Sequence, residues 1–214
     1  MSPLELLRVK GENEEEKEEK RKDRSNAGKA FEAEIRPLLT SAFSYTERIP
    51  DTRFFRFSSG HGNLITPKTK ADFVSFIMTD INGRKTSDTI YWECKSSERP
   101  ISYLLSTLGK RKNQVEWARV CSEGQLGVNV HFYYIIGNRS VHGDHYAMFF
   151  HGSTIVKWLD EGVSSMKWRD LERSSAVVLN KKGEPNYGTD ENVGQLLEHF
   201  SLVRKNIRKV NYEY

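Results

Sequence analysis

An apolar stripe at helical spacing is the first strong pattern in the chain. Ser25 and Asn26 are residue types that cap the N-termini of helices. The apolar residues that follow recur every three or four positions and are Phe31, Ile35, Leu38, Leu39 and Ala42. We therefore expect a first helix that packs this stripe against a core.

Extended patterns follow this helix. Strands are expected at residues 45–49, 53–58, 71–78 and 88–95 and, beyond two helical patterns at 101–108 and 110–124, at 130–137 and 145–152. A strand, a helix and another strand in this order imply a crossover connection, so the sheet should contain both parallel and antiparallel pairs. The expected fold class is α/β, with a central mixed β-sheet flanked by helices.

The two ends of the chain differ from this centre. Residues 10–24 hold seven acids and six bases with almost nothing apolar, so residues 1–24 are expected to form a charged N-terminal arm or a solvated helix. Residues 25–152 are expected to form the core. Helical patterns at 153–162, 164–172 and 192–207, with a loop at 183–189, predict that residues 153–214 are a mainly helical extension packed on that core.

The pair Asn82-Gly83 predicts how the third and fourth strands align. This pair is the strongest short signal for a two-residue hairpin turn. Such a turn places Ile81 opposite Arg84, and the same pairing carried outward places Asp72 opposite Glu93. A bulge near residues 85–88 would shift this alignment.

Two carboxylates and an ammonium would then share one side of the sheet. Lys95 lies two residues beyond Glu93, so in an extended chain the two side chains point to the same face, while Cys94 points to the other. Opposed like charges destabilise a strand pair unless a cation neutralises them, and oxygen ligands suit Mg²⁺ or Mn²⁺. With Lys95 alongside, the group has the parts needed for metal-assisted phosphodiester hydrolysis. The alternative is an ordinary ion pair of Glu93 and Lys95 on an edge strand.

Composition limits the other possibilities. The 214 residues suit one domain, and no apolar stretch approaches the roughly 18 residues that cross a bilayer. The start of the chain has no signal-peptide core, so a cytoplasmic location without membrane association is expected. Cys94 and Cys121 form neither a disulfide framework nor a thiolate zinc site. The net charge of +4 does not diagnose a nucleic-acid protein, but the cluster Lys110, Arg111 and Lys112 is a candidate for phosphate contacts.

A competing set of metal ligands lies in "HGDH", residues 142–145, followed by His151. His142, Asp144 and His145 have suitable chemistry. The segment has the pattern of a turn that leads into a strand, and it lacks the helical HExxH spacing of zinc hydrolases. We therefore favour the carboxylate site.

The carboxylate motif resembles a known nuclease family. "AD" at 71–72 and "ECK" at 93–95 resemble the PD-(D/E)xK signature, and the expected order of helix, three antiparallel strands, helix and strand resembles that superfamily's core. "NAGKAFEAEI", residues 26–35, is similar to the first helix of Holliday junction resolvases of the archaeal and RecU-like types, in which a Gly precedes a catalytic Glu by four residues. The pattern also resembles nucleases encoded by archaeal viruses. The resemblance covers about residues 25–137, and Ala71 stands where the motif has Pro.

This resemblance implies a restriction-endonuclease-like core and a role for each site residue. Asp72, Glu93 and the backbone carbonyl of Cys94 would bind Mg²⁺, with Mn²⁺ as a substitute, and Lys95 would orient or activate the attacking water. The full set that it implies comprises Glu32, Asp72, Glu93, Lys95 and Gln114 as catalytic groups, Glu32 also as an outer or second-metal ligand, and Ser58 or Ser59 as DNA contacts.

The choice of carboxylate on the first helix depends on the resemblance alone. Glu32 and Glu34 lie about equally far from the centre of the apolar stripe, on opposite sides of it. Only the four-residue spacing from Gly28 favours Glu32.

The implied function is a Mg²⁺-dependent endodeoxyribonuclease that acts on branched DNA such as Holliday junctions. A homodimer is expected, because a two-fold junction needs two symmetric cuts and because the apolar segment from Tyr133 to Gly152 exceeds what one core would be expected to bury. If the protein is viral, its location is the host cytoplasm. The alternative function is a non-catalytic DNA-junction-binding protein that keeps the nuclease fold.

Overall fold

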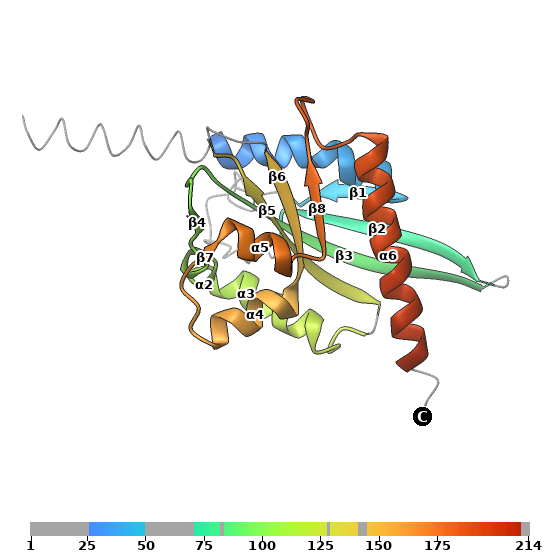
Figure 1. Cartoon of the computed structure of the whole chain (residues 1–214). Coiled ribbons are helices and arrows are strands. Elements are labelled where there is room, and N and C mark those ends of the chain that lie inside the picture. The colour runs from blue at the N-terminus through green and yellow to red at the C-terminus, as the bar shows by residue number, and fades with distance from the viewer. Residues whose placement is uncertain (1–25, 50–70, 82–83, 128, 141–144, 211–214) are drawn as a thin grey trace, which may run out of the picture.

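Six strands form one mixed sheet between two layers of helices (Figure 1). The computed structural model describes residues 26–49, 71–81, 84–127, 129–140 and 145–210. The strand order is β1-β2-β3-β5-β6-β8, with bounds Tyr45–Arg48, Phe73–Ile81, Arg84–Ser97, Val130–Asn138, Tyr146–His151 and Val177–Asn180. The expected α/β class with a mixed central sheet is therefore confirmed.

Helices cover both faces of this sheet. The helices comprise residues 26–42, α2 (Ser106–Gly109), α3 (Lys112–Ser122), α4 (Gly152–Asp160), α5 (Trp168–Ser174) and α6 (Asp190–Val210). A second, two-stranded sheet pairs β4 (Ser102–Tyr103) with β7 (Met166–Lys167). No helix within the described residues is long and apolar enough to span a bilayer.

The alignment of the β2–β3 hairpin agrees with the prediction. Ile81 pairs with Arg84, and the antiparallel pairs continue without a bulge to Phe73 and Trp92. The turn residues 82–83 themselves lie outside the described residues. Because the alignment continues to the last pair, Asp72 and Glu93 follow as neighbours at the end of this ladder.

The expected crossover lies between β3 and β5. These two strands are parallel, and the connection between them contains β4, α2 and α3. The predicted helix at 110–124 is α3, and it is followed by Gly124, whose φ of +69° ends the helix in a conformation that glycine adopts readily. This crossover places the apolar strand β5 in the middle of the sheet.

Alternate residues of β3 enter two separate cores. Ile90, Trp92 and Cys94 pack with the helix at 26–42 and with α6, whereas Tyr91 packs with α3 and the other helices of the second layer. The predicted stripe of the first helix is confirmed, since Phe31, Ile35, Leu38 and Leu39 are fully buried and Ala42 packs against them.

Polar side chains also join the first helix to the sheet. Trp92 Nε1 donates to Ser75 Oγ at 2.9 Å, the Ser75 and Thr46 hydroxyls are 2.8 Å apart, and Thr46 Oγ1 donates to the Leu39 carbonyl at 3.0 Å. The Leu39 carbonyl also accepts from the Phe43 N–H at 3.1 Å, so Thr46 adds a second hydrogen bond to it at the C-terminal end of the helix. The hydrogen bonds tie the end of the helix to β1, β2 and β3.

Three sequence predictions about local structure are wrong. The pattern at 101–108 is a short strand followed by the single turn of α2, and the pattern at 164–172 begins as strand β7. Ser102 and Tyr103 pair with residues far along the chain, so a tertiary contact overrides the local helical pattern. The edge strand β8, which pairs with β6, was not predicted at all.

The apolar residues of β5 and β6, which make up most of the apolar segment between Tyr133 and Gly152, are buried within the single chain, contrary to expectation. Tyr133, Tyr134, Ile135, Ile136, Met148, Phe149 and Phe150 are each at most 2% exposed. Strands β5 and β6 lie inside the sheet and have helices on both faces, so the two cores of the single chain accommodate their side chains. This part of the argument for a homodimer therefore fails. The predicted strand at 53–58 lies outside the described residues.

Candidate active site

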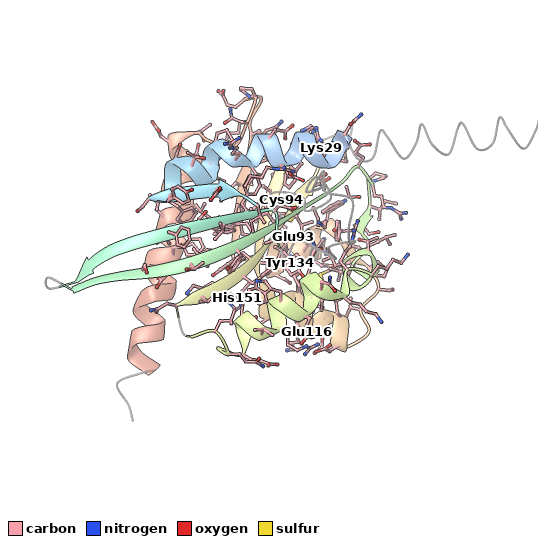
Figure 2. The ribbon with its side chains drawn as sticks, turned by 180° about the vertical axis from the view of Figure 1, so that it is seen from behind. Lys29, Glu93, Cys94, Glu116, Tyr134 and His151 are labelled. Atoms are coloured by element: carbon pink, nitrogen blue, oxygen red, sulfur yellow. The ribbon has the colours of Figure 1, made fainter. Side chains whose placement is uncertain are left out.

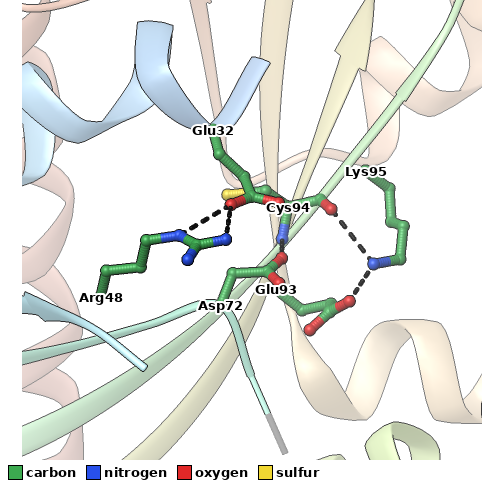
Figure 3. Close-up of polar contacts among 6 residues, drawn as sticks. All are labelled: Glu32, Arg48, Asp72, Glu93, Cys94 and Lys95. Carbon is green, nitrogen blue, oxygen red and sulfur yellow. Dashed lines mark hydrogen bonds and ion pairs between the residues drawn. The ribbon is translucent and has the colours of Figure 1, made fainter. Parts of the chain in front are cut away.

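Asp72 lies where the β2–β3 ladder ends, and both its backbone and its side chain bind to β3. Its N–H donates to the Trp92 carbonyl at 2.8 Å, and its Oδ2 accepts a hydrogen bond from the Cys94 N–H at 2.7 Å. These two contacts fix the carboxylate beside the backbone of Glu93 and Cys94 (Figure 3).

Glu93 and Lys95 form a contact on the opposite face from Cys94. Glu93 is fully buried, and Lys95 Nζ donates both to Glu93 Oε1 and, at 3.2 Å, to the Cys94 carbonyl oxygen. The Lys95 side chain keeps 26% of its surface exposed. The pair is therefore not the exposed edge-strand ion pair of the alternative interpretation, because β3 is an interior strand and the carboxylate has no contact with solvent.

The structure distinguishes the two carboxylates of the first helix. Glu32 Oε2 accepts from Arg48 Nε at 3.1 Å and from Arg48 Nη2 at 2.9 Å, next to Asp72 (Figure 3). Glu34 instead makes ion pairs with Arg139 at 3.3 Å and Lys181 at 3.1 Å. Glu32 is thus the carboxylate that lies at the candidate site, and the rotation of the helix on the sheet decides between them.

Burial and neighbouring charge shift the ionisation of the site. Burial raises the pKa of Glu93 to about 7, against a lowering effect from Lys95, and Asp72 raises it further. Burial also raises the pKa of Asp72, with an additional contribution from Glu32. Although burial opposes it, the carboxylates of Glu93 and Asp72 raise the pKa of Lys95. Simultaneous ionisation of Asp72 and Glu93 is therefore disfavoured, whereas Lys95 keeps its positive charge.

The structure adds residues that sequence reasoning missed. Arg48, on β1, binds Glu32, and the hydroxyl of Tyr134, on β5, is close enough to Glu93 for its pKa to be raised by that carboxylate, after the larger effect of burial. Tyr103 is buried near Lys95 and Glu93, and burial raises its pKa to about 12. No local signal could identify Tyr134 or Tyr103, because each reaches the site through a long-range strand pairing.

The remaining predicted residues are placed as follows. Gln114, in the first turn of α3, has its side-chain amide close enough to Glu93 to lower the pKa of that carboxyl. Lys110, Arg111 and Lys112 are exposed at the start of the same helix. Ser58 and Ser59 lie outside the described residues.

The competing histidine motif has a structural role where it can be followed. His142 and Asp144 lie outside the described residues. His151 is the N-cap of α4, where its side chain accepts from the Ser153 N–H, and its ring packs edge-on against Tyr133. Burial lowers the pKa of His151 to about 4, so the imidazole remains neutral at physiological pH.

The oxygens at the site suit a hard divalent cation that retains water. Within the described part of the chain, no three His, Cys, Asp or Glu side chains converge closely enough to form a metal centre by themselves. Asp72 and Glu93 supply two carboxylates, and Cys94 supplies a carbonyl oxygen. Mg²⁺ is usually held by one or two carboxylates, with water and phosphate completing its shell. The residues present therefore fit such an ion.

Two comparisons with known proteins add no family to this description. No protein-family model matches the sequence, and no curated protein matches it. The fold and the site therefore define the molecule as an α/β protein with a mixed six-stranded sheet and a partly buried acidic site at the end of its β2–β3 hairpin.

Proposed function

We propose that this protein is a Mg²⁺-dependent endodeoxyribonuclease with a restriction-endonuclease-like core. The observation that supports it most is the meeting of Asp72, Glu93 and Lys95 at one end of an antiparallel strand pair (Figure 3). The order of the first helix, β1–β2–β3, α3 and a parallel β5 supports the same proposal, because it has the sequence of elements that the nuclease resemblance implies.

Each residue has a role that its position supports. Asp72, Glu93 and the Cys94 carbonyl would hold Mg²⁺, which when bound would polarise a water molecule and neutralise phosphate charge. Lys95 is the partly exposed cation next to these ligands, so it can orient a water or contact a phosphate oxygen. Glu32 lies near Asp72 but binds Arg48, which suits an outer or second-metal ligand.

Branched DNA, such as a Holliday junction, is the substrate that the resolvase resemblance favours. The cluster Lys110, Arg111 and Lys112 is exposed at the start of α3 and comes after the site residues of β3 in the sequence. Exposed cations of this kind are suited to contact DNA phosphates. A homodimer stays a prediction that rests on the need for two symmetric cuts. Sedimentation at micromolar concentration, with and without junction DNA, measures it, and a monomer under both conditions would contradict it.

Cleavage of three labelled DNAs tests the proposed function: a four-way junction, a flap and a plain duplex. We expect cleavage with Mg²⁺, none with EDTA, and the junction cut fastest. Asp72→Asn should bind the junction as tightly as the unmodified protein and leave it intact. Metal-dependent cleavage by Asp72→Asn would contradict the proposal. Binding without cleavage by the unmodified protein would favour the non-catalytic junction-binding alternative.

A further inference from the structure

Glu93 Oε2, Tyr134 Oη and Gln114 Oε1 lie on the α3 side of the sheet and are buried without a hydrogen-bond partner among the described residues. Buried polar groups in folded proteins are nearly always hydrogen-bonded, so the presence of three such atoms around one carboxylate calls for a ligand.

The fold brings these three groups together. Glu93 and Tyr134 are direct partners in the parallel β3–β5 ladder, so their side chains leave adjacent strands on the same face, with the strands roughly 5 Å apart (Figure 2). Gln114 comes from α3, whose buried residues Ala118 and Cys121 pack in the same core as Tyr134, and its amide is close enough to Glu93 to affect the pKa of that carboxyl. Glu93 also raises the pKa of Tyr134, in addition to the larger effect of burial, which is consistent with this proximity.

The hydrogen-bonding capacities of the three groups match those of one water molecule. The Glu93 and Gln114 oxygens accept hydrogen bonds, and the Tyr134 hydroxyl donates one. Water has two donors for the two oxygens and can accept from the phenol, and a buried water typically makes about three hydrogen bonds. A metal ion would fit less well, because a neutral phenol and an amide next to one carboxylate offer it little charge.

We propose that Tyr134, Gln114 and Glu93 bind one buried water molecule, and that Tyr134 is through it a positioning residue for the Glu93 carboxylate. Lys95 holds Oε1 of this carboxylate, and the water holds Oε2, so the group is oriented from both sides. Carboxylates that bind metals are commonly oriented by such outer hydrogen bonds. The role in metal binding rests on the proposed function, whereas the shared water does not.

Tyr134→Phe tests this role because it removes only the hydroxyl. It keeps the ring, whose centroid lies 5.1 Å from that of Phe132. Tyr187→Phe is the matched control, since the Tyr187 hydroxyl is also buried without a partner among the described residues but lies near Glu34. Thermal melts are measured without metal and over a series of Mg²⁺ concentrations.

We expect Tyr134→Phe to lower the metal-free Tm by roughly 2–4 °C and Tyr187→Phe to leave it equal or higher. The Mg²⁺ concentration that gives half of the stabilisation should rise about tenfold in Tyr134→Phe alone. Under subsaturating Mg²⁺, kcat for junction cleavage should fall while KM for DNA stays unchanged. A Tyr134→Phe protein that behaves like Tyr187→Phe in the melts and the Mg²⁺ series would overturn the proposal.

A double-mutant cycle with Gln114→Met, which keeps the side-chain length, tests the shared water directly. If both residues hold one water, the two losses in metal-free Tm should add up to clearly more than the loss in the double variant. Additive losses would overturn the shared water. If Tyr134→Phe does not fold, Gln114→Met alone decides, since an unchanged Mg²⁺ response would contradict the proposal. If the unmodified protein responds to no metal and cleaves no DNA, the proposed function fails, while the metal-free cycle still decides on the water.

Discussion

Glu32 and Glu34 extend from one helix into two ionic clusters with opposite charge balance. The acidic cluster consists of Glu32, Asp72 and Glu93 with Arg48 and Lys95, so three carboxylates face two cations. The basic cluster consists of Glu34 with Arg139 and Lys181, so one carboxylate faces two cations. When every group is ionised, the first has a formal charge of −1 and the second of +1.

This difference indicates what each cluster does. The basic cluster joins the first helix to the chain just after β5 and just after β8 with its own cations, and Arg139 Nη1 also donates to the Ala27 carbonyl at 3.0 Å. The acidic cluster has a carboxylate in excess. Burial raises the pKa of both Asp72 and Glu93, and repulsion from Glu32 and Asp72, respectively, raises each of them further. A cation from outside, or a proton, relieves that repulsion. The basic cluster is thus a structural contact whose charges are met within the protein. The acidic cluster is a site that favours an added positive charge.

Cleavage should show the largest difference between the clusters. Glu93→Gln keeps the size of the side chain and removes a proposed metal ligand, so we expect at least a roughly 100-fold loss of Mg²⁺-dependent cleavage. Glu34→Gln changes the same chemical group in the basic cluster and should keep the rate within about threefold wherever it folds. A labelled four-way junction serves as substrate. Equal losses in the two variants would remove the distinction between the clusters.

The second-largest difference between the clusters is expected in how the stability of the fold depends on pH. The pKa of Glu93 is raised in the folded state to about 7 from 4.5, so the folded protein holds a proton that the unfolded chain releases in this window. The stability associated with this proton is present below pH 4.5 and is lost as the pH rises through about 7. At pH 8 the loss is on the order of 3 kcal/mol, because each pKa unit corresponds to about 1.4 kcal/mol.

Glu93→Gln measures this effect, since the amide does not ionise. In metal-free urea titrations, the free energy of unfolding of the variant relative to the unmodified protein should rise by about 1–3 kcal/mol between pH 4.5 and 8. Mg²⁺ at pH 8 should stabilise only the unmodified protein. A difference that is flat with pH would show that Glu93 is ionised at no cost, as in a purely structural ion pair.

Glu34→Gln should shift stability in the opposite direction. It leaves the partly buried cations of Arg139 and Lys181 without their carboxylate, which we expect to cost about 1–3 kcal/mol at pH 8. Thermal melts should show a Tm that is lower by roughly 2–4 °C for each kcal/mol. An unchanged Tm would mean that the basic cluster does not hold the first helix in place.

The smallest expected effect concerns the exposed bases at the start of α3. Replacing Lys110, Arg111 and Lys112 with Ala should weaken binding to all DNA sequences alike. The slope of the logarithm of the binding constant against the logarithm of the salt concentration should become shallower by up to about 3, because each phosphate contact releases about one counterion. The control replaces three exposed bases elsewhere, Lys157, Arg173 and Lys182, with Ala. Binding is measured between 50 and 200 mM salt, on the order of physiological ionic strength. Equal slopes for both triple variants would assign the α3 cluster to the solvated surface.

Local patterns were sufficient for the core of the site. The Asn82-Gly83 pair predicted the alignment of two neighbouring strands, and period-two alternation then placed Glu93 and Lys95 on one face and Cys94 on the other. Both rules act over a few residues of contiguous chain. For the same reason the apolar stripe of the first helix was predictable, whereas the short strands β4 and β7 were not, since each exists only through its partner.

Tertiary packing decided everything that depends on the relative placement of distant elements. The stripe on the first helix left Glu32 and Glu34 equivalent, and only the rotation of that helix on the sheet brought Glu32 to Asp72 and Glu34 to Arg139. Tyr134 lies beside Glu93 because the crossover through α3 set the parallel register of β5. The burial that raises the pKa of Glu93 has the same origin, since it arises from helices and strands that meet only in the folded chain. The sequence alone determined which side chains share a face, and the assembled layers determined which of those faces meet and how far each charge lies from water.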